Sequence, residues 1–115
     1  MKIKYDNKKV QTLFEDFELM AKNKGIKTTR MIKKRYNELL AATTFYEYRS
    51  YGLGKPHPLT QNKKGLYAVW VTNNIRLIIE PIAKDLSDEE LMKCTEVIIK
   101  GAEDYHGSKT TTYIP

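Results

Sequence analysis

The first quarter of the chain carries apolar residues at the spacing of an α-helix. The positions that share one face of this pattern are Val10, Leu13, Phe14, Phe17 and Met20 or Ala21. Side chains at such intervals form one stripe that faces a protein core. Asp6 or Asn7 provides an N-cap, and Gly25 provides a C-terminal stop. We therefore expect a helix that ends at Gly25, preceded by a short strand at residues 1–5, where apolar and charged residues alternate.

A second helical pattern begins near Thr28 or Thr29. Its predicted buried face consists of Ile32, Tyr36, Leu39, Leu40 and Thr43, and its outer face consists of Arg30, Lys33, Lys34 and Asn37. Few residues separate this pattern from the first one. The two helices are therefore expected to form an antiparallel hairpin.

Further along, the periodicity changes from helical to strand-like. Residues 66–72 and 75–81 are rich in β-branched and aromatic side chains. The Asn73-Asn74 pair between them predicts a β-hairpin with a two-residue turn. Alternation along the second strand places Arg76 on the opposite face from its two apolar neighbours. Arg76 is therefore expected to project from a rigid element.

The remaining pattern completes an α+β domain. Residues 86–92 predict a short helix or turn, and residues 95–99 predict a third strand. The polar tail at residues 108–115 predicts either an edge strand or a loose segment. Two helices followed by an antiparallel sheet belong to the α+β class. A chain of 115 residues is sufficient for one domain, which we place at residues 1–107, followed by the tail.

The net charge of +6 is distributed unevenly. Residues 1–64 hold 15 basic and 6 acidic side chains, a balance of +9, whereas residues 65–115 hold 5 and 8, a balance of −3. A basic half indicates a polyanionic partner, most simply a nucleic acid, although a lysine-rich surface can also serve solubility alone. No apolar run is long enough for a membrane span and no secretion signal is present, so a cytoplasmic location is expected.

A loop held by prolines joins the helical part to the hairpin. Pro56 and Pro58 favour extended backbone at the residues before them, so Lys55 and His57 lie on a stiff segment. An ordinary polar connection fits the same residues. Residues 44–54 interleave aromatic side chains with Arg49, which suits either stacking on unpaired bases or packing against the sheet.

The chemistry that the ionisable residues support is proton transfer combined with fixed positive charge. The candidates are Lys55, His57, Lys63, Lys64, Arg76, Tyr105 and His106. The sequence lacks the glycine-rich phosphate loop, the zinc-ligand spacings and the nucleophile elbow that would support other chemistries. Histidine can take either proton role near neutral pH, and arginine can stabilise a phosphate. This set suits RNA cleavage by the substrate's own 2′-OH, without a metal.

Three segments carry a resemblance to a known family. In chain order they read Lys55-Pro-His-Pro-Leu-Thr-Gln-Asn-Lys-Lys-Gly65, Ile75-Arg-Leu-Ile-Ile-Glu80 and Glu103-Asp-Tyr-His-Gly107. Their order and spacing resemble the HigB, or killer-protein, branch of the RelE/ParE toxin superfamily over nearly the whole chain. The resemblance implies two helices packed on a small curved antiparallel sheet. It also implies a metal-independent endoribonuclease without a cofactor that cleaves messenger RNA on the translating ribosome, and a helix-turn-helix antitoxin as partner.

The same resemblance implies roles for individual residues. His57 matches the proton-transfer histidine of the family, and Arg76 matches the arginine that stabilises the scissile phosphate. Tyr105 and His106 match a C-terminal pair that holds the RNA base and assists catalysis. Thr60 stands where HigB proteins often carry a lysine, so another lysine would have to supply that charge. The predicted RNA-binding residues are Lys55, Lys63, Lys64 and Arg49.

Two other functions remain open. A toxin of the ParE type shares the fold but binds DNA gyrase and cleaves nothing, and it would not need a histidine, an arginine and a tyrosine that converge on one site. A catalytically silent nucleic-acid-binding relative would need only the basic half of the chain. The replacement of the family lysine by Thr60 favours this second alternative.

Overall fold

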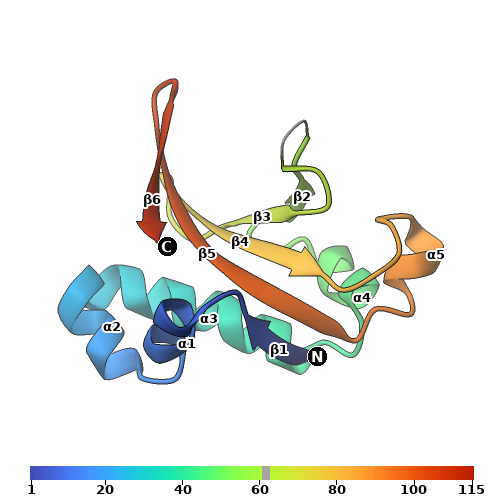
Figure 1. The fold of residues 1–115 in the computed structure, drawn as a ribbon, viewed down its shortest axis with the longest axis horizontal. Helices are drawn as coiled ribbons and strands as arrows, with labels where there is room; N and C mark the ends of the chain where they lie inside the picture. The colour runs from blue at the N-terminus through green and yellow to red at the C-terminus, as the bar shows by residue number, and fades with distance from the viewer. Residues whose placement is uncertain (61–62) are drawn as a thin grey trace.

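Helices cover one face of a mixed β-sheet in the computed structural model, which describes residues 1–60 and 63–115 (Figure 1). The elements in chain order are β1 (Lys2–Tyr5), α1 (Lys8–Phe14), α2 (Phe17–Lys24), α3 (Ile26–Ala41), α4 (Phe45–Ser50), β2 (His57–Pro58), β3 (Tyr67–Trp70), β4 (Ile75–Pro81), α5 (Asp88–Leu91), β5 (Glu96–His106) and β6 (Lys109–Ile114). Helices α1, α2 and α3 lie below the sheet in Figure 1, whereas β2 and the β5–β6 hairpin rise on its other side.

The strand order of the sheet is β1-β5-β4-β3-β2, and β6 pairs with the second half of β5. β1 runs parallel to the first half of β5, and all other neighbouring strands in the described residues are antiparallel. A parallel pair needs a long crossover connection, which the helices and the hairpin between β1 and β5 supply. The predicted α+β class is confirmed, but the sheet is mixed and not purely antiparallel.

The first predicted helix is divided into two. α1 ends at Phe14, and α2 begins after Asp16, whose side chain accepts a hydrogen bond from the Leu19 backbone N–H at 3.1 Å. An aspartate competes with a continuing helix because its carboxylate satisfies the free N–H groups of a new one. The apolar stripe still faces the core, since Phe14 and Met20 are buried.

The second predicted helix is α3, which follows directly after Gly25. The φ of +89° at Gly25 turns the chain between α2 and α3. Ile32 and Leu39 are fully buried as predicted, but Leu40 and Thr43 are exposed. Adjacent helical residues point about 100° apart, so Leu40 faces away from the core that Leu39 enters. Thr43 lies beyond the end of α3.

The β3–β4 hairpin has a longer loop than the predicted two-residue turn. The Val71 N–H donates to the Ile75 carbonyl at 2.9 Å, and the Thr72 hydroxyl accepts the Ile75 N–H at 3.0 Å, so three residues form the loop. The hydroxyl therefore satisfies a backbone donor at the start of β4. As a result Trp70 pairs with Arg76, whereas a two-residue turn would have placed Val71 opposite Arg76.

β5 extends well past the predicted third strand. Gly101 adopts a φ of +138° where the register between β4 and β5 shifts. A side chain at this position would overlap the Ile114 carbonyl of β6. Ile114 is 1% exposed, so the tail is an edge strand that contributes to the core, one of the two predicted alternatives.

The core lies between the helices and the sheet. Its largest fully buried side chains are Tyr48, Tyr67, Phe14, Phe45, Met20, Ile32, Leu39, Leu77, Ile79, Leu91, Ile99 and Ile114. Within the described residues, the Tyr48 hydroxyl is buried without a hydrogen-bond partner. None of the helices in the two described ranges combines the length and the apolar composition of a membrane span.

Candidate active site

The face of the sheet opposite the helices gathers most of the predicted site residues, and we call it the open face. Paired residues on neighbouring strands point to the same side of a sheet. Trp70, Arg76 and Glu103 form one such row across β3, β4 and β5. His57 of β2 pairs with Ala68, which lies two residues before Trp70 and therefore faces the same way.

Arg76 provides a fixed cation on the open face. Its side chain is 9% exposed, and its guanidinium lies 4.1 Å from the centre of the Trp70 ring and 5.3 Å from the centre of the Tyr105 ring. Nη1 donates to the carbonyls of Thr72 at 2.9 Å and Ile75 at 3.3 Å. Burial lowers the pKa of Arg76 from its ordinary value. Among residues 1–60 and 63–115, no carboxylate forms an ion pair with Arg76 and its other donors remain unused.

Tyr105 belongs to a hydrogen-bonded group beside this arginine. Its hydroxyl donates to Oε1 of Glu103 at 3.3 Å, and the Lys63 ammonium donates to both Glu103 oxygens at 2.7 and 2.6 Å. Burial and then the negative charge of Glu103 raise the pKa of Tyr105. Tyr105 therefore remains a phenol at neutral pH, which can donate a proton but does not accept one.

His57 is exposed and is anchored through one ring nitrogen. Its Nδ1 lies 3.0 Å from the Lys55 carbonyl. A carbonyl can only accept a hydrogen bond, so Nδ1 carries the hydrogen of the neutral ring and Nε2 is left to exchange a proton. His57 lies two strands and two residues from Arg76, a Cα separation of about 12 Å from strand spacing.

Lys55 extends the positive charge of the open face. Its ammonium lies 4.7 Å from the centre of the Trp70 ring, on which Arg76 also stacks. The φ of +49° at Lys55 is the one positive value outside glycine in the described part of the chain. Such a conformation is unfavourable for a side chain with a Cβ, so the loop geometry holds it in place. Lys64 is exposed near the start of β3.

His106 does not join the other candidates. It follows Tyr105 on β5 and therefore points to the opposite side of the strand. Its Nδ1 lies 3.3 Å from a carboxylate oxygen of Asp104, which also faces that side. The side chain is exposed beside the turn of the β5–β6 hairpin. The structure thus groups Tyr105 with Arg76 and separates His106 from both.

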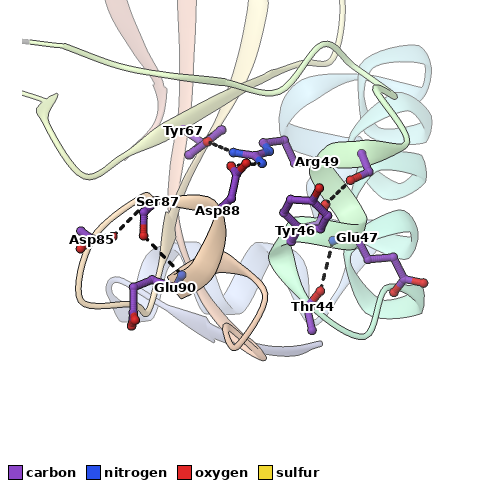
Figure 2. A network of polar contacts seen from close by, with 10 residues as sticks. Thr44, Tyr46, Glu47, Arg49, Tyr67, Asp85, Ser87, Asp88 and Glu90 are labelled. Carbon is purple, nitrogen blue, oxygen red and sulfur yellow. Dashed lines mark hydrogen bonds and ion pairs between the residues drawn. The ribbon is translucent and has the colours of Figure 1, made fainter.

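Arg49 is engaged in a structural network away from the open face (Figure 2). Its guanidinium donates to Asp88 at 2.7 Å and to the Tyr67 hydroxyl at 3.3 Å, and it lies over the Tyr46 ring. The hydrogen bond to Asp88 raises the pKa of Arg49. These contacts join α4 to α5 and β3. They explain the position of the Arg49 side chain without any contact to RNA.

Two residues of the open face were not predicted from the sequence. Trp70 becomes the neighbour of Arg76 only through the three-residue loop, which the Asn73-Asn74 signal concealed. Glu103 could have been found, because it precedes Tyr105 by two residues and must share its face. In the described ranges, no group of three or more His, Cys, Asp and Glu side chains is placed to hold a metal ion.

Comparisons with known proteins identify the fold. No family model matches the sequence, and no curated protein sequence matches it. A solved YoeB/ParE toxin from Agrobacterium tumefaciens has 15% sequence identity and a TM-score of 0.56, over 93% of this chain and 100% of that chain. A YoeB-YefM complex from Staphylococcus aureus has 20% identity and a TM-score of 0.55, over 93% of this chain and 98% of the other. A YoeB dimer from the same organism has 20% identity and a TM-score of 0.52, with the same coverage.

These similarities confirm the predicted RelE-like fold. The strands that carry Arg76 and Tyr105 belong to a scaffold that YoeB/ParE-type toxins share over nearly the whole chain. None of the neighbours named here indicates the HigB branch in particular.

Proposed function

We propose that the protein is the toxin of a type II toxin-antitoxin system and an endoribonuclease that cleaves messenger RNA on the translating ribosome. The observation that carries this proposal is Arg76, a nearly buried cation without a carboxylate partner in the described residues, on one face with His57 and Tyr105. A buried charge of this kind is costly unless a ligand uses it. The fold shared with YoeB/ParE toxins supports the same proposal.

The reaction is an internal transesterification. The 2′ oxygen of the substrate attacks the adjacent phosphorus, the bond from phosphorus to the 5′ oxygen breaks, and a 2′,3′-cyclic phosphate and a 5′-hydroxyl result. A base removes the 2′ proton, and an acid protonates the leaving 5′ oxygen. The free donors of Arg76 would bind the phosphate oxygens, where a fixed cation contributes about 3 kcal/mol to the stability of the transition state.

His57 and Tyr105 are the groups that can move protons. The free Nε2 of His57 can accept the 2′ proton or return one to the leaving group, since an imidazole nitrogen can serve in either proton role. Tyr105 can donate a proton or stack on a base. Either proton role fits His57, whereas Tyr105, as a phenol, fits only the role of the acid.

The partners follow from the same function. Messenger RNA and the ribosome would supply the polyanion that the positive charge of residues 1–64 predicts. One Staphylococcus aureus neighbour is a heterotetrameric YoeB-YefM toxin-antitoxin complex, which supports an antitoxin partner for this chain. The HigB-like segments of the sequence favour a helix-turn-helix antitoxin, and an action on translation places the protein in the cytoplasm.

One observation favours the second candidate, a catalytically silent nucleic-acid-binding relative. Thr60 leaves the family lysine position without charge, and Glu103 neutralises Lys63, the nearest described lysine in chain order that could replace it. Only Lys55 and Arg76 are then free cations beside Trp70 among the described residues. A ParE-type toxin has no comparable support, because it requires no convergence of His57, Arg76 and Tyr105.

Inducible expression in bacterial cells, followed by mapping of 5′-hydroxyl ends in messenger RNA, tests the proposal. The wild type is expected to produce growth arrest and new ends within translated frames. Arg76→Ala and His57→Ala are expected to lose both effects. Arg30→Ala serves as the matched control, because Arg30 is an exposed arginine on α3, on the other side of the sheet.

Other outcomes separate the alternatives. Growth arrest without new RNA ends would indicate a toxin that acts by binding, as in the ParE type. The absence of both effects in the folded wild type would indicate the silent relative. New ends that persist in Arg76→Ala would refute the role of Arg76.

A further inference from the structure

Arg76 and Glu103 carry opposite charges and face each other across two strands, but they form no ion pair. They are register partners on β4 and β5, and both side chains lie on the open face. The Cβ atoms of such partners lie about 5 Å apart, a distance at which opposite charges stabilise a sheet. Among residues 1–60 and 63–115, however, the Glu103 carboxylate contacts only Lys63 and Tyr105. The separation of two charges so placed points to a competitor for one of them.

Lys63 is this competitor. Its ammonium donates to both Glu103 oxygens, at 2.7 and 2.6 Å. The turn before β3 fixes the Lys63 backbone, whose N–H donates to the Thr60 carbonyl and whose carbonyl accepts from the Leu66 N–H, each at 3.2 Å. The Glu103 side chain is 22% exposed, so water screens the pair less than it screens an ion pair at the surface. Lys63 thus holds the carboxylate by both of its oxygens.

Arg76 is held on the other side of β4. Its Nη1 donates to the Thr72 carbonyl, and its guanidinium lies over the ring of Trp70, which belongs to β3. Glu103 belongs to β5, the opposite neighbour of β4. The two charges nevertheless stay close, because Tyr105 contacts both. The centre of its ring lies 5.3 Å from the guanidinium, and its hydroxyl lies 3.3 Å from the Glu103 carboxylate.

An ion pair between Arg76 and Glu103 would occupy the cation that the proposed chemistry needs. A carboxylate binds a guanidinium with the same fork geometry as a phosphate, so the two compete for the same donors. Without the Lys63 ammonium, a partly buried carboxylate would lack a cation, and this cost favours a new pair with Arg76. The state of Lys63 therefore decides whether Arg76 is free.

We propose that Lys63 is a positioning residue, which binds the Glu103 carboxylate and thereby keeps the Arg76 guanidinium free for an anion. Lys63 acts through Glu103 and does not itself contact the phosphate. The use of the free guanidinium in RNA cleavage rests on the proposed function. The competition between Lys63 and Arg76 for the carboxylate does not, because it takes place without RNA.

Double-mutant cycles in urea unfolding test the competition directly. The cycle combines Arg76→Met with Glu103→Gln, whose amide oxygen can still accept the Tyr105 hydroxyl. In the wild type, the coupling is expected to stay below about twofold in the unfolding equilibrium constant. In a Lys63→Met background it is expected to exceed about tenfold, because the new ion pair has formed. In a Lys63→Arg background it is expected to stay low, since arginine can also hold the carboxylate.

Lys4→Met provides the matched background. Lys4 also pairs with a glutamate of β5, Glu96, at 3.2 Å, but at the other end of that strand. The coupling in this background is expected to equal that of the wild type. Equal coupling in the wild type and in Lys63→Met would overturn the proposal.

Mapping of 5′-hydroxyl RNA ends in cells tests the consequence. Lys63→Met is expected to lower the yield of new ends at least about tenfold, whereas Lys4→Met is expected to leave it unchanged. Addition of Glu103→Gln to Lys63→Met is expected to restore the ends, because no carboxylate then competes for Arg76. A lysine that bound the phosphate directly could not be replaced in this way. Ends that stay lost in the double variant would therefore overturn the positioning role.

The two proposals can fail separately. If the wild type cleaves no RNA, the endoribonuclease is refuted, and the unfolding cycles still decide the role of Lys63. If RNA is cleaved but the coupling is the same in every background, the positioning role alone is refuted.

Discussion

Arg76, the cation of the proposed active site, is held in place at a cost to stability. The guanidinium is nearly buried, and burial lowers its pKa because the charged form is removed from water. Two backbone carbonyls and two aromatic rings compensate in part for the lost hydration of the guanidinium, but no carboxylate among the described residues does. A side chain that served only the fold would be more stable here without the charge.

This arrangement predicts that Arg76→Met separates activity from stability. Methionine retains an unbranched stem that can pack between the Trp70 and Tyr105 rings, and it removes the cost of the buried charge. The free energy of unfolding is expected to stay within about 1 kcal/mol of the wild type, as measured in urea. RNA cleavage and growth arrest are expected to be lost. A folded Arg76→Met protein that still arrests growth would contradict the assignment.

Tyr48→Phe is expected to stabilise the protein. The Tyr48 ring is 1% exposed, and its hydroxyl lacks a hydrogen-bond partner among the described residues. Removal of an unsatisfied buried hydroxyl is expected to raise the free energy of unfolding by about 1 kcal/mol. Urea unfolding measures this change, and Tyr46→Phe is a control because Tyr46 is only half-buried on the same helix. A loss of stability in Tyr48→Phe would show that the hydroxyl is satisfied in solution.

For individual residues, the sequence is informative where the residue lies in a short motif. The predictions for Arg76, Tyr105 and His57 rest on motifs that lie within short segments, and the structure brings Arg76 and Tyr105 together. The network of Arg49 could not be found, since its partners Asp88 and Tyr67 are distant in the chain. The separation of His106 from Tyr105 could have been inferred, because consecutive strand residues face opposite ways.

At the scale of elements, small capping groups decide where helices and hairpins begin. The apolar pattern correctly identified the buried face of the first helical region, but Asp16 divides that region into α1 and α2. The hydroxyl of Thr72 enlarges the β3–β4 loop in the same manner. A hydrophobic pattern does not contain this information, because an N-cap or a turn hydroxyl acts through single hydrogen bonds.

Gly101→Ala is expected to detach β6 or to destabilise the whole protein. A methyl group there would overlap the Ile114 carbonyl, and the φ of +138° is unfavourable for any residue with a Cβ. We expect a loss of about 3 kcal/mol in the free energy of unfolding. In the comparison variant Gly52→Ala, the φ is +69° and no atom lies within 4 Å of the added methyl, so a loss of about 1 kcal/mol is expected. Equal losses in the two variants would mean that the overlap with β6 does not affect the free energy of unfolding.

At the scale of the molecule, the positive charge of residues 1–64 is divided between two sides of the sheet. Lysines of α1, α2 and α3 lie on the helical side (Figure 1), whereas the loop between α4 and β2 places Lys55 over the Trp70 ring of the open face. The total charge therefore overstates the number of cations that one RNA strand can contact. The net charge of residues 1–64 can be counted from the sequence, but only the fold shows on which side of the sheet each charged residue lies.

The salt dependence of RNA binding is expected to reflect this division. For single strands, the logarithm of the affinity falls with the logarithm of salt concentration by about 0.7 for each phosphate contacted. Lys55→Ala is expected to reduce this slope by about 0.7 in titrations with an uncleavable 2′-deoxy oligonucleotide. Lys34→Ala, an exposed change on α3, is expected to leave the slope unchanged. If Lys34→Ala reduces the slope and Lys55→Ala does not, the RNA binds on the helical side of the sheet.

The stacking of two cations on Trp70 has a practical consequence. Trp70 is the only tryptophan of the chain, so all indole fluorescence of the protein originates within a few ångströms of Arg76 and Lys55. Indole emission responds to charge near the ring. Any anion that draws either cation away from the ring would therefore alter the emission, and the protein carries its own optical probe of site occupancy without a label or an engineered reporter.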